Sequence, residues 1–216
     1  MSAGRVESEL KFWAADERPL DALAAAAVLG PTELGPPHGV DELDHYLDTV
    51  DLRLAEVRWA CRIREREGRT ILSMKGPAEH AAGAAVHRRP EVEGVAGAGL
   101  IPSGWPLSTA RDLLLDLARG APLLERFTLA QHRIERSVTG AGAPIGLLSL
   151  DRSRVLHRGV ELGLLLVVEL EFSSEALAAG LDPDPLAAAL GAMPGLVHDP
   201  LTKLERALAL VAAAVP

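Results

Sequence analysis

The chain has 216 residues, 48% of them hydrophobic, which is enough to bury a substantial core. Its formal charge of −8 argues against broad nucleic-acid binding, because such binding depends on a basic surface. The single cysteine excludes an intramolecular disulfide framework and any cluster of cysteine metal ligands, so a cytoplasmic protein with oxygen-ligated metals is expected. The longest apolar run, residues 162–168, is too short to cross a bilayer, and we expect no membrane association and one domain over residues 1–216.

The N-terminal segment predicts a strand with one charged face. Residues 6–12 alternate between apolar and polar side chains, so Glu7, Glu9 and Lys11 share the face opposite the apolar one. A short helix is expected over residues 19–29, which are rich in Ala and Leu and have an acidic start and a Gly-Pro stop. A turn-rich loop follows.

Four strands are predicted in the next part of the chain, and the second and third form an antiparallel hairpin around Gly68. They span residues 46–49, 60–67, 69–75 and 87–95. Arg62, Arg64 and Arg66 share one face, opposite Cys61, which is expected to face the core. The in-phase charged residues of the other strands are Lys75, Arg89, Glu91 and Glu93. For the last three, a lumen and an exposed edge remain equal alternatives.

The C-terminal half repeats this order of strands and helices without a residue-level repeat. Strands are expected at residues 124–138, around 147–151, around 154–157 and at 164–172. Helices are predicted over residues 109–119, 174–179, 184–192 and 203–215. Glu169 and Glu171 lie two apart in the last strand and therefore on one face.

The number and order of these elements favour an α+β fold built on a closed antiparallel β-barrel with flanking helices over a parallel sheet. Taken singly, each charged face is explained well by the solvated side of a half-buried sheet. Two Glu-x-Glu strands together with several Arg or Lys strands instead favour a wet, charged lumen.

A charged lumen of this composition predicts a site for a metal ion and a phosphate-bearing small molecule. Carboxylates two residues apart on a strand lie about 7 Å apart, close enough to ligate one ion or two adjacent ions. Oxygen ligands of this kind select Mg²⁺ or Mn²⁺, which also bind phosphate oxygens. Arginine and lysine side chains in the same lumen would pair with the remaining phosphate charge.

Seven sequence segments, taken in order, carry a resemblance to a known family. The strand Glu7-Ser-Glu9-Leu-Lys11 resembles the ExExK signature of the CYTH domain, also called the triphosphate tunnel metalloenzymes. Residues 46–54, 61–65 and 72–77 are similar to the family's next block in order and spacing. The later similarities are Arg126, Arg133 and Arg136 with a basic strand, residues 169–171 with a second acidic strand, and residues 202–207 with a C-terminal lysine helix.

This resemblance implies an eight-stranded antiparallel tunnel that holds a metal and a triphosphate. The implied metal ligands are Glu7, Glu9, Glu169 and Glu171, with Asp151 as a further candidate whose neighbours depart from the family's usual Asp-x-Gly turn. The implied phosphate-binding residues are Lys11, Arg62, Arg64, Lys75, Arg133 and Lys203. Glu7, Glu9 and Lys11 are also the candidate catalytic residues.

The function expected on these grounds is metal-dependent hydrolysis of a phosphoanhydride bond. Inorganic tripolyphosphate is the first candidate substrate, because no sequence feature compels a nucleobase or thiamine pocket. The alternatives are a class IV-type adenylyl cyclase, a thiamine or nucleoside triphosphatase, and a non-catalytic polyphosphate-binding module. Trp13 is expected at the rim of the tunnel, with stacking on an organic group as the alternative. A homodimer is an open alternative to a monomer.

Overall fold

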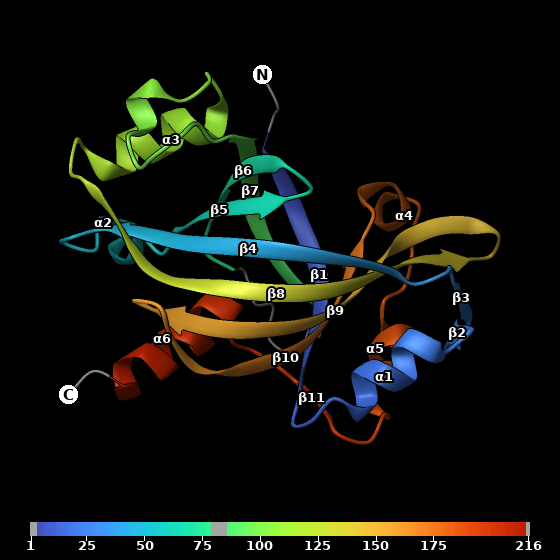
Figure 1. Cartoon of the computed structure of the whole chain (residues 1–216). Helices are drawn as coiled ribbons and strands as arrows, with labels where there is room; N and C mark the ends of the chain where they lie inside the picture. The colour runs from blue at the N-terminus through green and yellow to red at the C-terminus, as the bar shows by residue number, and fades with distance from the viewer. Residues whose placement is uncertain (1–3, 79–85, 215–216) are drawn as a thin grey trace.

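A computed structural model describes residues 4–78 and 86–214, and its centre is a closed antiparallel barrel of eight strands (Figure 1). Around the barrel the strands follow the order β4-β5-β6-β7-β1-β10-β9-β8, and the β4–β8 pairing closes the ring. The eight strands are β1 Arg5–Ala14, β4 His38–Thr49, β5 Ala60–Arg66, β6 Arg69–Lys75, β7 Val86–Val95, β8 Leu123–Gly140, β9 Ala143–His157 and β10 Val160–Phe172. The predicted fold class is confirmed.

Three of the hairpins use the same tight turn. Two residues connect β5 to β6, β8 to β9 and β9 to β10, and the second of the two is a glycine each time: Gly68, Gly142 and Gly159. Both residues of each turn have positive φ, which matches the type I′ turn whose twist suits neighbouring strands. These turns fix the register of the strands, and the register determines which side chains point into the barrel.

Smaller elements extend the barrel. The short strands β2 Val28–Leu29 and β3 Thr32–Leu34 continue the sheet beyond β8, and β11 Leu196–His198 pairs with β1. The helix predicted over residues 19–29 is therefore too long, because α1 Arg18–Ala25 ends before β2 begins. Pairing of β2 with β3 and burial of Leu29 outweigh the helical propensity of this segment.

Two strands are longer than predicted. β4 begins eight residues before the predicted start because its inward residues Glu42 and Asp44 are charged, which hides the apolar alternation. β9 is one continuous strand where two were expected, since polar Ser153 faces inward at its middle. In both cases polar residues of the lumen interrupt the pattern that signals a half-buried strand.

Helices cover the barrel on three sides, and a separate apolar cluster is buried on each of these sides. α1 and α5 Asp184–Gly191 pack against β1, β9 and β10, while α2 Arg53–Glu56 and α3 Thr109–Ala118 pack against β5, β6 and β7. Cys61 lies in this second cluster, as expected. Two further helical elements are α4 Ser174–Ala178 and the short 3₁₀ helix Pro102–Gly104.

The C-terminal helix α6 Lys203–Ala214 differs from the others because it packs on inward-facing side chains. Its apolar residues contact Tyr46, Phe127, Leu165 and Val167. The last two share a face of β10 with Glu169 and Glu171 by strand alternation. The first residue of α6, Lys203, consequently reaches the lumen. No helix within residues 4–78 and 86–214 is long and apolar enough to cross a membrane.

Candidate active site

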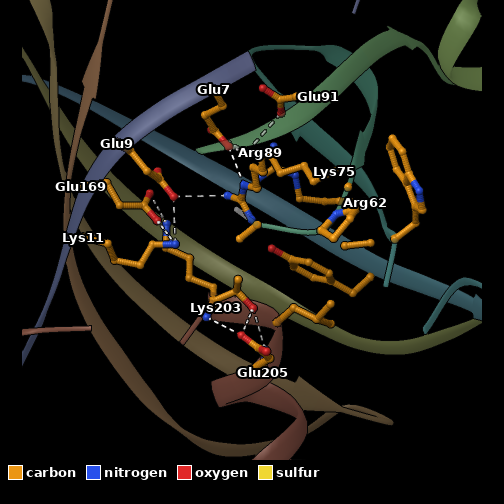
Figure 2. Close-up of a pocket in the computed structure, with 18 of the residues that line it drawn as sticks. Glu7, Glu9, Lys11, Arg62, Lys75, Arg89, Glu91, Glu169, Lys203 and Glu205 are labelled. Carbon is orange, nitrogen blue, oxygen red and sulfur yellow. Dashed lines mark hydrogen bonds and ion pairs between the residues drawn. The ribbon is translucent and has the colours of Figure 1, made fainter. Parts of the chain in front are cut away.

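A cavity of about 340 Å³ lies inside the barrel, and every barrel strand and α6 contribute to its wall (Figure 2). Its cationic lining residues are Arg5, Lys11, Arg58, Arg62, Arg64, Lys75, Arg89, Arg133 and Lys203. Its carboxylate lining residues are Glu7, Glu9, Glu91, Glu93, Glu169, Glu171 and Glu205. The in-phase charged faces therefore line a lumen, and this settles the position of Arg89, Glu91 and Glu93 in favour of the lumen.

The three predicted residues of β1 are almost enclosed by the cavity wall, with Glu7, Glu9 and Lys11 each 5% exposed or less. The Glu7 carboxylate accepts hydrogen bonds from Lys75 Nζ at 2.7 Å and from Arg89 Nε at 2.6 Å. Lys11 Nζ lies 3.0 Å from Glu9 Oε1. Burial alone would raise the pKa of Glu7, but Lys75 and Arg89 hold it well below its usual range. Glu7 is thus a charged group tied to cations of two neighbouring strands.

Glu169 is the most heavily paired carboxylate of the cavity wall. Lys203 Nζ lies 2.8 Å and Arg133 Nη2 3.2 Å from its Oε2 atom, and Lys11 Nζ lies 3.4 Å from Oε1. Burial alone would raise the pKa of Glu169, but these three cations hold it well below its usual range. Glu169 therefore joins cations from β1, β8 and α6 at one point.

Glu171 has the opposite electrostatic environment, although it lies only two residues further along β10. It faces Glu9 directly in the strand register, and Arg5 Nη1, at 2.9 Å, is its ion-pair partner. Burial raises the pKa of Glu171, and the neighbouring charges of Glu7 and Glu91 add to this effect. The β1–β10 pairing thus sets two carboxylates, Glu9 and Glu171, opposite each other.

The donor chemistry of this region fits a divalent cation. Glu7, Glu9, Glu169 and Glu171 offer hard oxygen donors from two paired strands, which suits Mg²⁺ or Mn²⁺. Among residues 4–78 and 86–214, however, no three His, Cys, Asp or Glu side chains are grouped so that they could hold an ion. The predicted convergence of carboxylates is absent from this arrangement because each one pairs with Lys or Arg instead. Metal binding would exchange these ion pairs for metal–oxygen contacts.

Asp151 lies behind the cavity wall instead of on it. It is fully buried and accepts hydrogen bonds from Arg133 Nε and Nη2, both at 2.7 Å, and from Lys203 Nζ. Burial alone would raise the pKa of Asp151, but Arg133 and Lys203 lower it. The structure thus places this candidate metal ligand under two phosphate-binding candidates and away from the cavity.

A second buried carboxylate pair, Glu42 and Asp44 on β4, is absent from the sequence-based site. Asp44 accepts hydrogen bonds from Arg64 Nε and Nη2, at 2.7 Å each. Arg64 Nη2 also lies 3.0 Å from the Glu42 carboxylate. Burial alone would raise the pKa of Asp44, but Arg62 and Arg64 hold it well below its usual range. Extension of the predicted strand from Tyr46 towards its N-terminus would have found both carboxylates, since they share its alternation.

Arg62 is held more loosely than Arg64. Its Nη1 atom lies 3.4 Å from Asp44 Oδ2 and its Nη2 atom 3.3 Å from Ser73 Oγ. Its Nε atom is buried and has no hydrogen-bond partner within the part of the chain that the structure describes. Arg62 therefore retains hydrogen-bonding capacity beside the cavity.

Two arginines that resemble the family's basic strand do not line the cavity. Arg133 points into the lumen, whereas Arg126 and Arg136 are absent from the cavity wall. Arg136 donates to backbone carbonyls of the segment that carries α1 and β3. Its five acceptors are the carbonyl oxygens of Leu23, Ala24, Ala26, Leu34 and Gly35. The role of Arg136 is to fix that segment to β8.

Part of the cavity wall is apolar, which sequence reasoning did not anticipate. Tyr46, Trp59, Leu204 and Leu208 line it beside the charged residues. Tyr46 is stacked on Phe127, with ring centroids 4.7 Å apart. Trp13, the predicted rim residue, is not a lining residue, and its ring lies 5.2 Å from Arg206 Cζ in a cation–π contact.

The family model of the CYTH domain matches residues 6–182 of the chain. The chain belongs to the CYTH family. Triphosphate tunnel enzymes of this family generally depend on a divalent metal. The match includes the acidic strands β1 and β10 and all barrel strands between them.

A curated relative is similar in sequence to part of this chain. YjbK of Bacillus subtilis (strain 168), named as a candidate triphosphatase, is 30% identical over 119 residues, which are 55% of this chain and 57% of YjbK. The match thus spans little more than half of that relative's length.

Two solved structures share the fold. One is HpAC1 from Hippeastrum, described as a candidate adenylyl cyclase with a dominant triphosphatase activity; its TM-score is 0.66 at 18% identity, over 94% of this chain and 95% of that chain. The other is a candidate adenylate cyclase from Bacillus halodurans, with a TM-score of 0.59 at 24% identity, over 95% of this chain and 98% of that chain. At these identities the likeness establishes the barrel architecture alone.

Proposed function

We propose that this CYTH protein is a divalent-metal-dependent triphosphatase and that inorganic tripolyphosphate is its first substrate. The observation that carries the proposal is one cavity inside the barrel in which nine cationic side chains surround two paired Glu-x-Glu strands. Cations in such a lumen bind phosphate oxygens, and paired carboxylates bind the metal that accompanies them.

Charge balance supports the need for a metal. Glu42, Asp44 and Asp151 lie behind the wall and pair with lining cations, so they add three negative charges to the seven lining carboxylates. Arg66 also lies behind the wall and pairs with Glu42, so ten carboxylates face ten cations, which leaves no excess positive charge for a polyanion. Divalent ions that enter with a triphosphate neutralise part of its negative charge. A triphosphate without such ions would meet a lumen that has no surplus positive charge to bind it.

The reaction that follows is attack of a water oxygen on a terminal phosphorus, with cleavage of the P–O–P bond and release of orthophosphate and pyrophosphate. Arg62, Arg133 and Lys203 are suited to hold the phosphate oxygens and to stabilise the charge that develops on them. A divalent ion held by the Glu-x-Glu strands would neutralise phosphate charge and polarise the scissile bond. A lining carboxylate, or a second ion, would orient the attacking water.

The choice of hydrolase over cyclase rests on two supports. YjbK is named as a candidate triphosphatase, and HpAC1, although described as a candidate cyclase, has a dominant triphosphatase activity. Tripolyphosphate is placed first among the substrates because it consists of phosphate groups alone, and the charged residues of the lumen can bind these without a pocket for an organic group.

The deciding experiment incubates the purified protein with tripolyphosphate, ATP or thiamine triphosphate and with Mg²⁺ or Mn²⁺, and identifies every product. Orthophosphate from tripolyphosphate supports the proposal. Cyclic nucleotide and pyrophosphate from ATP would make the protein a cyclase. Tripolyphosphate binding that needs no metal, occurs without turnover and survives the double change Glu7→Gln and Glu9→Gln would make it a binding module.

A further inference from the structure

Four lining cations rest on two buried aspartates, and these four residues, Arg62, Arg64, Arg133 and Lys203, are named here the cation wall. Asp44 is fully buried on β4, lies outside the cavity lining and contacts Arg62 and Arg64 of β5. Asp151 is fully buried on β9, also lies outside the lining and contacts the other two cations. Neither aspartate can touch a ligand in the cavity without displacement of the cations that cover it.

The two aspartates lie on strands that flank β8 on either side. Asp44 is in register with Leu129 of β8, and Asp151 is in register with Arg133, four residues further along the same strand. Lys203 also contributes to the electrostatic environment of Asp44, so the two aspartates belong to one connected network. This network lies under the cation wall on the side of the barrel where α6 enters.

The contacts differ in a way that orients the cations. Arg64 and Arg133 each form two short parallel hydrogen bonds with an aspartate, the geometry that fixes a guanidinium plane most firmly. Arg62 contacts Asp44 only through a long hydrogen bond of 3.4 Å. Its buried Nε atom has no hydrogen-bond partner among residues 4–78 and 86–214. A buried N–H group without an acceptor is costly, and a ligand oxygen would remove that cost.

We propose that Asp44 and Asp151 are positioning residues, which hold the cation wall in the orientation that binds the phosphate chain of the substrate. The inference rests on the proposed function, because it takes a triphosphate as the ligand of the cavity. Groups behind the residues that contact a ligand commonly fix the orientation of those residues in this manner.

In a simpler role the two aspartates would act only as counter-charges to the cations. The two roles predict opposite changes in the affinity for an anionic ligand when an aspartate is neutralised. Loss of a mere counter-charge makes the lumen more positive and strengthens the binding of an anion. Loss of a positioning carboxylate frees the cations to adopt other rotamers and weakens binding. Neutralisation of Asp44 therefore separates the two roles by the direction of the change in affinity.

The experiment compares Asp44→Asn and Asp151→Asn with the wild-type protein. Steady-state hydrolysis of tripolyphosphate with Mg²⁺ gives KM and kcat, and calorimetric titration with imidotriphosphate and Mg²⁺ gives a Kd that does not depend on turnover. Positioning predicts that each change raises KM and Kd about 10- to 100-fold, with a smaller effect on kcat.

Glu135→Gln is the matched control. Like the two aspartates, Glu135 lies on a barrel strand, here β8, and it pairs with Arg66, but neither Glu135 nor Arg66 lines the cavity. This change removes one negative charge near the lumen without releasing a member of the cation wall, so KM and Kd should not rise.

Asp44→Glu provides a second test in case Asp44→Asn does not fold. It keeps the charge and displaces the carboxylate, so positioning predicts weaker binding and a counter-charge predicts wild-type binding. Wild-type or tighter binding by the Asn variants overturns the positioning role. A wild-type protein that neither binds imidotriphosphate nor hydrolyses tripolyphosphate overturns the proposed function itself, and the inference with it.

Discussion

Replacement of Lys203 by methionine should destabilise the protein through charge and not through packing. Methionine keeps the length of the side chain but leaves Asp151 and Glu169, the two carboxylates at the Lys203 ammonium, with fewer cations. Removal of one partner from a buried ion pair typically costs about 3–5 kcal/mol of the free energy of unfolding. Because Arg133 still pairs with both carboxylates and Lys11 with one, we expect about 2–3 kcal/mol at pH 7.

The pH dependence of this loss identifies its cause. The pKa values of Asp151 and Glu169 are lowered in the folded protein, so their contribution to stability is present above their unfolded pKa values and is lost as the pH falls through the folded ones. Without Lys203 the folded pKa values rise towards the unfolded values of about 4. The difference between wild type and variant should therefore stay constant from pH 7 to about pH 5 and shrink below about pH 4.

Urea unfolding monitored by circular dichroism at several pH values between 7 and 3 measures this difference. Lys203→Arg serves as the control, because it keeps the charge and should largely keep the stability at pH 7. A loss of stability that is the same at pH 7 and at pH 3 would refute the electrostatic argument, since it would trace the role of Lys203 to the packing of its hydrocarbon stem.

Three further predictions concern the metal, the acidic strands and the outer face of the barrel. Chelation with EDTA should abolish tripolyphosphate hydrolysis, and Mg²⁺ or Mn²⁺ should restore it, which phosphate release would measure; undiminished activity in EDTA would contradict the charge balance of the lumen. The double change Glu9→Gln and Glu171→Gln should lower kcat/KM by about 100-fold or more, because it removes the carboxylate pair that faces across β1 and β10. Arg136→Met should lower the free energy of unfolding by about 2–4 kcal/mol, since its carbonyl partners lose a charged donor, while KM stays unchanged.

The sequence predicted the barrel and much of the cavity wall because strand alternation determines which side chains share a face. Glu7, Glu9 and Lys11 could be assigned to one face from their spacing alone, and the repetition of such faces indicated a lumen. Their roles as catalytic and metal-binding residues remain predictions. The metal ligand set in particular depends on rotamers that no spacing determines.

The carboxylates that the sequence did not place correctly share one cause, which is the pairing of charges between different elements of the fold. Asp44 and Arg64 are 20 residues apart, and Lys203 and Asp151 are 52 residues apart. The β4–β5 pairing brings Asp44 to Arg64, and the entry of α6 into the barrel brings Lys203 to Asp151. Spacing within a strand therefore could not distinguish a carboxylate on the cavity wall, such as Glu169, from one behind it, such as Asp151.

This distinction divides the carboxylates of the barrel into two groups with different chemical freedom. Glu7 and Glu169 lie on the wall, where an ion that enters the cavity can replace their Lys and Arg partners. Asp44 and Asp151 are covered by the cations that they hold and keep those partners. Metal binding at the first group would release cations such as Lys75 towards the phosphate oxygens, while the second group keeps the rest of the wall in place. We therefore expect metal and triphosphate to strengthen each other's binding, since each supplies the partners that the other displaces.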